Sequence, residues 1–254
     1  MPTLAPAAGN YAPGYFASGL FDQDYESVAA AICETYRPRT VLDVGCGPGH
    51  LSRALARRGT KVVAIDGHAS PRFEDGEIAF ARCNLDSPED LADVSARWPQ
   101  PFDLTVCLEV AEHVAPDSSE ALIAFLCARS PVVVFSAAVP GQGGEGHVNC
   151  QPRSAWHDRF ARHGFHLAHR VRPQLSAQAN LPDWYRFNVL DYAQGAAPPA
   201  ETDRLVRGLL TCESDLASRY YERGPAITAM QVQLGHAPVR LYLDLRAALK
   251  RLLR

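Results

Sequence analysis

Two segments of this 254-residue chain place carboxylate or imidazole side chains where they could act as ligands, acids or bases. In the first, Glu109, Glu112 and His113 occupy positions i, i+3 and i+4, which share one face if the segment turns helical. The second is the glycine-rich segment 140–149, which carries His147. An imidazole with a pKa near neutrality is suited to accepting a proton from a reacting group. We therefore predict His113 and His147 as catalytic residues, with two carboxylates beside them.

The elements that must position these groups are apolar strands alternating with amphipathic helices between residues 40 and 171. This alternation is typical of parallel βαβ units, and it predicts an α/β fold with a doubly wound, mostly parallel sheet. Ligands of such sheets bind in the crevice at the carboxyl ends of the strands, where both chemical segments fall. Seven strands are expected: they begin near residues 41, 61, 78, 102, 131 and 164, and the seventh lies near 186–192.

The first predicted strand runs into three closely spaced glycines, Gly45, Gly47 and Gly49, and then into a helix. A strand, a tight turn and a helix start bring bare backbone close to a nucleotide-like ligand. A dinucleotide fingerprint needs Gly-x-Gly-x-x-Gly, and its last glycine is replaced here by His50. The turn therefore predicts an adenosine-bearing ligand and argues against an NAD-dependent oxidoreductase.

This glycine spacing, with Asp43 inside the strand, resembles motif I of the class I S-adenosylmethionine-dependent methyltransferases. The resemblance implies a Rossmann-like fold and S-adenosyl-L-methionine as the cofactor. Asp66 ends the second strand about twenty residues after the first glycine, where a carboxylate can accept hydrogen bonds from both ribose hydroxyls. Asn84 is expected to face the adenine amino group, where the family usually has Asp, with Leu85 beneath the ring. The expected donor-binding residues are Asp43, Gly45, Cys46, Gly47, Gly49, Asp66, Asn84, Leu85, Leu108 and Glu109.

The Glu-x-x-Glu-His pattern, followed by a later His, resembles the metal-binding set of the small-RNA 2′-O-methyltransferases. Its Glu-x-x-Glu-His part is also similar to that of the ubiquinone-pathway O-methyltransferases. The first resemblance implies that Glu109, Glu112, His113 and His147 hold a divalent ion that grips the acceptor hydroxyls. Mg, Mn, Fe or Zn would lower the pKa of a bound hydroxyl. Two alternatives remain: a histidine acts directly as general base, or these residues only contact the donor and orient the loops.

Residues 11–195 resemble bacterial methyltransferases found with glycan and secondary-metabolite biosynthesis. The residues that carry this likeness include Trp156, Trp184, Tyr185 and Arg186, which line the acceptor pocket or belong to the core. The resemblance implies O-methylation of a hydroxyl on a sugar, a glycan or another small polar metabolite. N-methylation, C-methylation and an inactive donor-binding module that serves a partner are the remaining alternatives.

Composition excludes several classes of protein. The net charge is −3 and no long basic tract occurs, so long nucleic acid is not an expected partner. The cysteines are seven in number and contain no Cys-x-x-Cys pair, which indicates reduced thiols and a cytoplasmic location. No apolar run approaches the ~18 residues of a membrane span, so integral membrane association is not expected.

We expect three parts: an N-terminal arm and helix over 1–37, a methyltransferase domain over 38–195, and a mostly helical C-terminal extension over 196–254. The arm carries aromatic side chains that either close over the donor or pin the arm to the surface. Segment 239–254 predicts an amphipathic helix with a basic end, which packs on its own domain or contacts a partner enzyme or an anionic membrane. The apolar positions of that helix are Leu241, Leu245, Ala248, Leu249 and Leu252.

Overall fold

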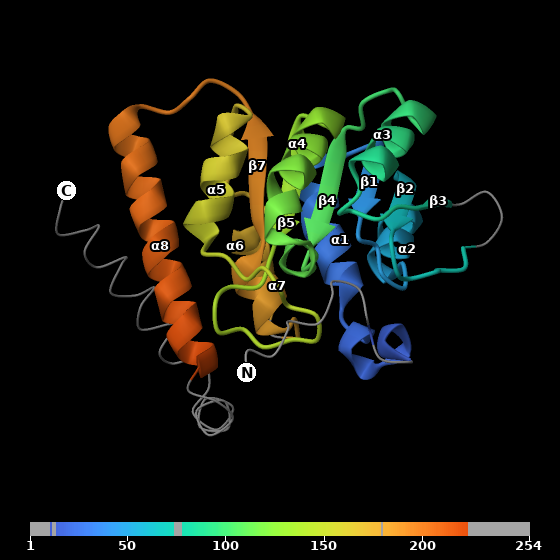
Figure 1. Ribbon diagram of the computed structural model, residues 1–254, viewed down its shortest axis with the longest axis horizontal. Coiled ribbons are helices and arrows are strands. Elements are labelled where there is room, and N and C mark those ends of the chain that lie inside the picture. The colour runs from blue at the N-terminus through green and yellow to red at the C-terminus, as the bar shows by residue number, and fades with distance from the viewer. Residues whose placement is uncertain (1–10, 12–13, 74–77, 179, 223–254) are drawn as a thin grey trace.

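The computed structural model describes residues 11, 14–73, 78–178 and 180–222 (Figure 1). Within these residues, one mixed sheet of seven strands has the order β3-β2-β1-β4-β5-β7-β6. The five strands β1 to β5 pair in parallel, while β7 is antiparallel to both of its neighbours. The strands are β1 Thr40–Val44, β2 Lys61–Asp66, β3 Ile78–Arg82, β4 Leu104–Leu108, β5 Val132–Ser136, β6 Phe165–Leu167 and β7 Leu190–Gln194. The expected α/β fold is therefore confirmed.

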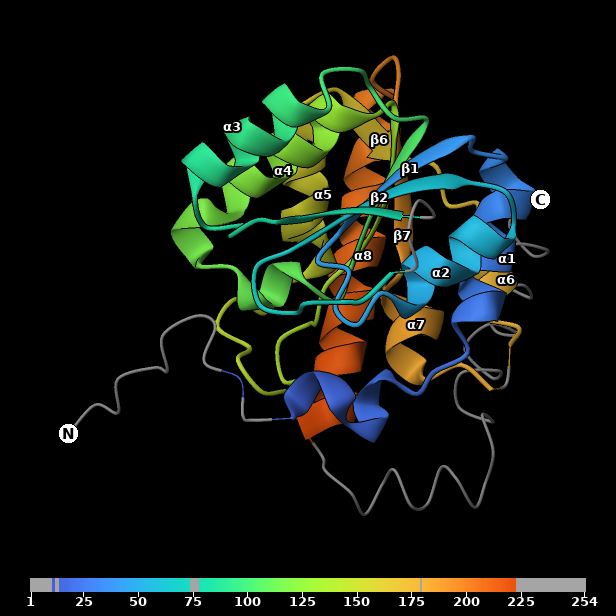
Figure 2. The same ribbon diagram turned by 90° about the vertical axis from the view of Figure 1, so that its right-hand side faces the viewer.

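Helices cover both faces of the sheet (Figure 2). One layer contains α3, α4, α5 and α8, and the other contains α1, α2, α6 and α7. The α-helices are α1 Tyr25–Tyr36, α2 His50–Arg57, α3 Pro88–Arg97, α4 Ser119–Arg129, α5 Arg153–Arg162, α6 Arg172–Leu175, α7 Asp183–Asn188 and α8 Ala200–Glu222. The 3-10 helices are η1 Tyr15–Ala17, η2 Gly19–Phe21, η3 Ala111–His113 and η4 Pro116–Ser118.

The central strand β4 shows why these sequences form buried parallel strands. Its side chains alternate between the two apolar cores: Leu104 and Val106 pack under α1 and α2, and Cys107 packs under α4. A strand that is covered on both faces needs apolar residues at successive positions rather than at every second one. The apolar run in the sequence therefore has a direct structural cause.

The seventh strand was predicted near 186–192, and this prediction is wrong in its first half. Residues Asp183–Asn188 form α7, which is preceded by Pro182 as its N-cap, and the strand begins only at Leu190.

The strand β6 is shorter than expected, and Asp191 explains why. Its buried carboxylate accepts hydrogen bonds from the backbone N–H groups of Arg170 and Val171, which turns the chain out of the sheet.

The helix α8 packs against α5 and continues the helical layer on that face (Figure 1). Ser214 and Leu210 face inward and are buried, and the Ser214 hydroxyl accepts a hydrogen bond from the backbone N–H of Arg153. The expected helical extension is thus observed as far as Glu222. The predicted amphipathic helix over 239–254 lies outside the described residues. Over the part of the chain that the structure describes, no helix is long and apolar enough to span a membrane.

Candidate functional site

A cavity of about 300 Å³ opens at the carboxyl ends of the parallel strands. Both sets of predicted residues line it: the predicted donor-binding residues, which we call the donor wall, and the Glu and His side chains. Gly49 is the one predicted donor-binding position that is absent from the cavity lining among the described residues. The lining includes Asp43, Gly45, Cys46, Gly47, Asp66, Asn84, Leu85, Leu108, Glu109, Glu112, His113 and His147.

The turn after β1 requires glycine at its first position for a packing reason. Gly45 has a φ of 73°, and a side chain on it would collide with Val110 in the loop after β4. Gly49 has a φ of 80° and begins α2, where an added Cβ would lie 2.5 Å from the ring of Phe73. These two glycines therefore let the turn pack tightly against protein side chains. Gly47, between them, faces the cavity.

Asp66, at the end of β2, ties this turn to the next loop. Its carboxylate accepts three backbone N–H bonds, from Gly47 at 2.9 Å and from His68 and Ala69 at 2.7 Å each. Each carboxylate oxygen has two lone pairs, so the group can still accept bonds from a ligand. Asp66 thus holds the glycine turn and borders the cavity at once.

Asp43 lies beneath the turn and is 4% exposed. Its Oδ2 accepts a hydrogen bond from the Ser52 hydroxyl at 2.5 Å. Burial raises the pKa of Asp43 to about 7, and the nearby charge of Asp66 acts in the same direction. The sequence pattern placed Asp43 near a donor, and the structure shows it joining β1 to α2.

Asn84 and Leu85 lie on the wall beside Asp66. The side-chain oxygen of Asn84 accepts a hydrogen bond from the backbone N–H of Asp86 at 3.1 Å, and Leu85 is buried. Asp86 also lines the cavity, and its Oδ1 accepts a bond from the backbone N–H of Ala115 at 2.9 Å. Asp86 is not among the residues predicted from the sequence. Its position two residues after Asn84 on the same loop could have indicated that it lines the cavity.

Glu109 follows β4 in an unusual backbone conformation. Its φ of 55° lies in the left-handed region, which is uncommon for a residue with a side chain and recurs at functional sites. Its carboxylate accepts hydrogen bonds from the side-chain amides of Gln142 at 3.0 Å and Asn188 at 3.3 Å. Burial raises the pKa of the Glu109 carboxyl. The conformation and both amides fix the carboxylate at the cavity wall.

The buried guanidinium of Arg153 is linked to Glu109 through Asn188. The guanidinium of Arg153 donates to Oδ1 of Asn188 at 2.6 Å, and the amide of Asn188 donates to both Glu109 and Gln142. Arg153 is 4% exposed, and burial lowers its pKa to about 10. The four side chains form a connected polar network, which rigidifies the floor of the cavity.

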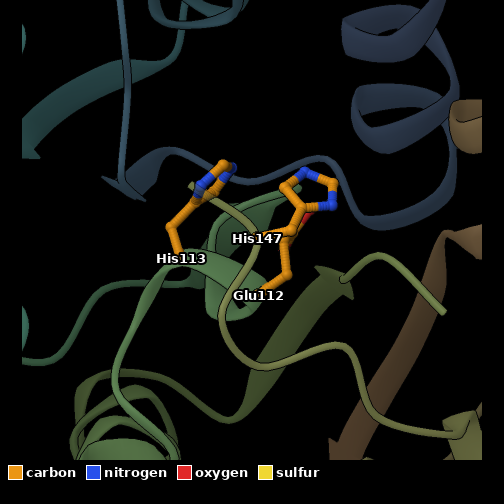
Figure 3. Close-up of side chains that lie close together, drawn as sticks. All are labelled: Glu112, His113 and His147. Atoms are coloured by element: carbon orange, nitrogen blue, oxygen red, sulfur yellow. The ribbon is translucent and has the colours of Figure 1, made fainter. Parts of the chain in front are cut away.

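The structure brings Glu112, His113 and His147 together (Figure 3). One ligand atom from each lies within 4.8 Å of the others. Glu109 does not join this group, because η3 begins at Ala111 and the shared helical face stops short of it. Three of the four residues predicted to bind a metal are therefore adjacent, and the fourth is held by amides nearby.

Buried, unpartnered polar atoms mark this cluster. Glu112 is fully buried, and among the described residues neither of its carboxylate oxygens has a hydrogen-bond partner. Burial raises its pKa well above the ordinary value, and the neighbouring Glu109 charge adds to the effect. Nδ1 of His113 is likewise buried without a partner within the described ranges. Polar atoms left in this condition are costly unless a ligand satisfies them.

Both imidazoles of the cluster are biased toward the neutral form. Burial, followed by the neighbouring His147, lowers the pKa of His113 to about 4, and burial lowers the pKa of His147. Their rings meet edge to face with centroids 4.8 Å apart. Neutral imidazole is the form that binds metal ions or accepts protons.

The glycines of loop 140–149 allow His147 to fold back into the cluster. A side chain on Gly144 would overlap the imidazole ring of His147. Nδ1 of His147 lies 3.1 Å from the backbone carbonyl of Gln142, and a hydrogen on Nδ1 satisfies that oxygen. This arrangement leaves the lone pair on Nε2.

Aromatic residues of the N-terminal arm border the same cavity. The ring of Tyr11 lies 5.7 Å from that of His113 and 5.2 Å from that of His68, in edge-on geometry. Tyr11 also stacks on Tyr15 at 4.6 Å. All four residues line the cavity, so the arm contacts the site rather than a remote surface.

A second group of aromatic residues also lines the cavity. Trp184 and Tyr185 of α7 line it, together with Tyr25 of α1 and Tyr221 of α8. Trp156 instead lies in the core, where its ring packs against Phe135. The remaining candidate, Arg186, donates to the backbone carbonyl of Ser176 at 3.1 Å. Tyr25 and Tyr221 were missed by our sequence analysis, because they come from helices at opposite ends of the chain.

The fold and this cavity define a class of protein, and comparison with known proteins agrees. A family model described as a methyltransferase domain matches residues 22–170. The chain therefore belongs to the methyltransferase domain family. Its sheet with helices on both faces is the Rossmann-like fold of class I methyltransferases.

Several curated proteins that the chain is similar to are named ubiquinone biosynthesis O-methyltransferase. The chain is 39% identical over 99 residues to a ubiquinone biosynthesis O-methyltransferase of Hahella chejuensis, a match that covers 36% of this chain and 38% of the relative. It is 45% identical over 85 residues to a protein of that name from Xylella fastidiosa, covering 30% and 32%. The chain thus spans about a third of the length of the curated relatives it matches.

Among solved structures, the methyltransferase domain of bacterial-CtHen1-C has a TM-score of 0.50 with this chain. The two are 17% identical, and the match covers 70% of this chain and 100% of that domain. At this level of identity the likeness supports the fold alone.

Proposed function

We propose that this protein transfers the methyl group of S-adenosyl-L-methionine to a hydroxyl oxygen of a small polar acceptor. One observation carries the proposal: a single cavity is lined both by the glycine turn and Asp66 and by Glu112, His113 and His147. A donor bound against the glycine turn and Asp66 would share this cavity with the Glu and His side chains. Holding donor and acceptor together in one geometry lowers the barrier to methyl transfer.

The residues of the donor wall support the proposed binding of an adenosine, because they line the cavity with both polar and apolar groups. Asp66 offers carboxylate lone pairs for ribose hydroxyls, while Asn84 and Leu85 offer a polar edge and an apolar surface for adenine. The donor brings the sulfonium methyl group, and the protein contributes orientation. Glu109, fixed by Gln142 and Asn188, provides a carboxylate at the far end of this wall.

The cluster of Glu112, His113 and His147 fits a divalent metal ion. Two unpartnered carboxylate oxygens and two neutral imidazoles are the mixed ligand set that suits Mn, Fe or Zn, and Mg where water completes the shell. Such an ion lowers the pKa of a bound hydroxyl and so makes it a better nucleophile. Glu109 is not part of this ligand set, because its carboxylate is bonded to the amides of Gln142 and Asn188.

His147 has a second candidate role as general base. The specific observation in its favour is the position of Nδ1 against the Gln142 carbonyl, which leaves Nε2 as the proton acceptor. In that arrangement the acceptor hydroxyl gives its proton to Nε2 as the oxygen attacks the methyl carbon. Chelation separates the two roles, because only the metal-assisted reaction depends on a removable ion.

The acceptor is proposed to be a hydroxyl of a sugar, a glycan or another small polar metabolite. The aromatic residues of the cavity support this class, because Trp184 and Tyr185 combine flat apolar rings with polar atoms. The cavity volume of about 300 Å³ suits a small molecule. Long nucleic acid is not part of the proposal, given the net charge of −3.

The cellular location proposed for the protein is the cytoplasm. All seven cysteines are free thiols, and four of them sit at half-buried or exposed positions. Free thiols persist in a reducing compartment.

The test of the proposed function has two stages. Calorimetry with S-adenosylhomocysteine and with NAD should show binding of the first alone, and absence of that binding would overturn the donor assignment. A panel of hydroxylated sugars and small metabolites, incubated with methyl-labelled donor, should then yield a labelled ether. Donor binding without transfer to any oxygen, nitrogen or carbon acceptor would favour a donor-binding module.

A further inference from the structure

The helix α8 carries apolar residues on two faces. Its inner face packs against α5 through Leu210, which is 2% exposed. Its outer face carries Leu205, Leu209 and Leu216, which are 60%, 42% and 52% exposed, together with the exposed Cys212. We call these four outer residues the α8 stripe. The helix lies at one end of the molecule (Figure 1).

The spacing of the α8 stripe is that of a helix seam. Its residues follow one another at intervals of four, three and four, so they form one narrow row along the helix. A surface helix normally places charged or polar residues on the side away from its domain. Three exposed leucines in a single row therefore indicate an interaction surface.

The same spacing recurs once more in the chain. In segment 239–254, Leu241, Leu245, Ala248 and Leu252 also follow at intervals of four, three and four. If the two rows are set antiparallel, every residue of one meets a residue of the other. The pairs are Leu205 with Leu252, Leu209 with Ala248, Cys212 with Leu245, and Leu216 with Leu241. The two inner pairs each match a large side chain to a small one, which favours close packing.

Charge and chain length agree with this pairing. Segment 239–254 is strongly basic. In α8, Asp203, Arg207 and Glu213 pair with other parts of the domain, and three acidic residues and two basic residues remain. Residues 223–238 connect the end of α8 to the segment, and at up to ~3.3 Å per residue they are long enough for the chain to return along the helix. The charged residues of the segment are Arg240, Asp244, Arg246, Lys250, Arg251 and Arg254, and those of α8 are Glu201, Asp203, Arg204, Arg207, Glu213, Asp215, Arg219 and Glu222.

We propose that segment 239–254 forms a helix that packs antiparallel on the α8 stripe of its own chain. The resulting helical hairpin buries the exposed leucines and supports the end of α8 that carries Tyr221 into the cavity. The occupant is intramolecular, since the matching row, the opposite charge and a sufficient connection all belong to this chain. A second copy or an anionic membrane on the stripe would be a different outcome of the test.

The pairing predicts one specific cross-link. In the full chain, Leu245→Cys places a thiol opposite the native Cys212, at the ~5.5 Å between Cα atoms that a disulfide requires. Lys250→Cys is the matched control, because position 250 faces away from the row. Mild oxidation followed by peptide mass spectrometry and non-reducing gels should show a Cys212 disulfide within one chain for L245C, formed at least ~10-fold faster than for K250C.

Three results of the cross-linking experiment would overturn the proposal. They are no disulfide in L245C, equal rates in L245C and K250C, or disulfides that join two chains only. The third would show that a second copy covers the stripe.

Hydrogen exchange on the unaltered full chain tests the hairpin without introducing a cysteine. Backbone amides of residues 241–252 should be protected at least ~10-fold relative to those of an unstructured segment, and Leu209→Glu should abolish that protection. Arg204→Glu, an exposed change on α8 outside the row, should leave it intact. Absence of protection in the unaltered chain, or protection that appears only with anionic lipid vesicles, would contradict the hairpin.

Discussion

The backbone N–H of Gly47 donates a hydrogen bond to Oδ2 of Asp66 at 2.9 Å, so the glycine turn and the end of β2 form one unit. Asp66→Asn keeps the size of the side chain and removes one acceptor oxygen. We expect S-adenosylhomocysteine to bind ~10-fold or more weakly by calorimetry, since a hydrogen bond to a charged group contributes ~1.5–3 kcal/mol. The exposed Asp93→Asn serves as control, and equal affinity in both variants would refute the ribose role.

His147→Ala should separate chemistry from donor binding. His147 lies in the Glu112 cluster rather than on the donor wall, so loss of its imidazole should reduce turnover ~100-fold or more while donor affinity is kept. Single-turnover kinetics with a confirmed acceptor measures the first quantity, and calorimetry measures the second. His163→Ala, which alters a contact with Glu120 at the surface, should be nearly silent. Unchanged turnover in H147A would remove His147 from the mechanism.

Glu112→Gln tests the metal proposal without any knowledge of the acceptor. A divalent ion at ~100 times its dissociation constant should stabilise the unaltered protein by ~2.7 kcal/mol. Thermal unfolding in the presence of Mn, Zn or Mg, and again after chelation, should therefore show a metal-dependent rise in Tm. In E112Q this rise should largely disappear. If neither metal nor chelator changes the Tm of the unaltered protein, the metal proposal is contradicted. The role of His147 as general base would then be the remaining alternative.

Asp43 predicts a pH-dependent stability difference. Its pKa in the folded protein is raised to about 7, from the ordinary value of 3.8, because burial disfavours the charged form. Between these values the folded state holds a proton that the unfolded state has released, so this group's contribution to the unfolding free energy falls as pH rises. The Tm of Asp43→Asn relative to that of the unaltered protein should therefore be higher at pH 8 than at pH 4. A difference independent of pH would contradict the buried-acid assignment.

The residues of the donor wall could be predicted from the sequence because they follow short local patterns. Each of its polar residues sits within a few positions of a strand end, and parallel strands bring those ends to one edge of the sheet. Asp66 and Asn84 could be placed in this way without knowledge of distant contacts. The family match over residues 22–170 covers this same part of the chain.

Other features depend on contacts that no local pattern encodes. The left-handed turn at Glu109, which removes this residue from the cluster, is fixed by amides from Gln142 and Asn188 far along the chain. Tyr221 reaches the cavity only because α8 packs against α5. The predicted start of β7 was wrong for a similar reason. The preceding residues form the short helix α7, whose Trp184 and Tyr185 line the cavity, and no local pattern distinguishes this helix from a strand.

The reversed direction of β7 has a consequence for how this protein can change. Because β7 runs opposite to β5, the chain leaves the sheet at the amino edge, and the 23-residue α8 carries it back to the carboxyl edge. Late residues such as Tyr221 thereby reach the cavity, whereas the glycine turn and Asp66 belong to the ends of the first two strands. Under the proposed function, substitutions near the C-terminal end of α8 would alter the acceptor side of the cavity and leave the residues proposed to bind the methyl donor unchanged.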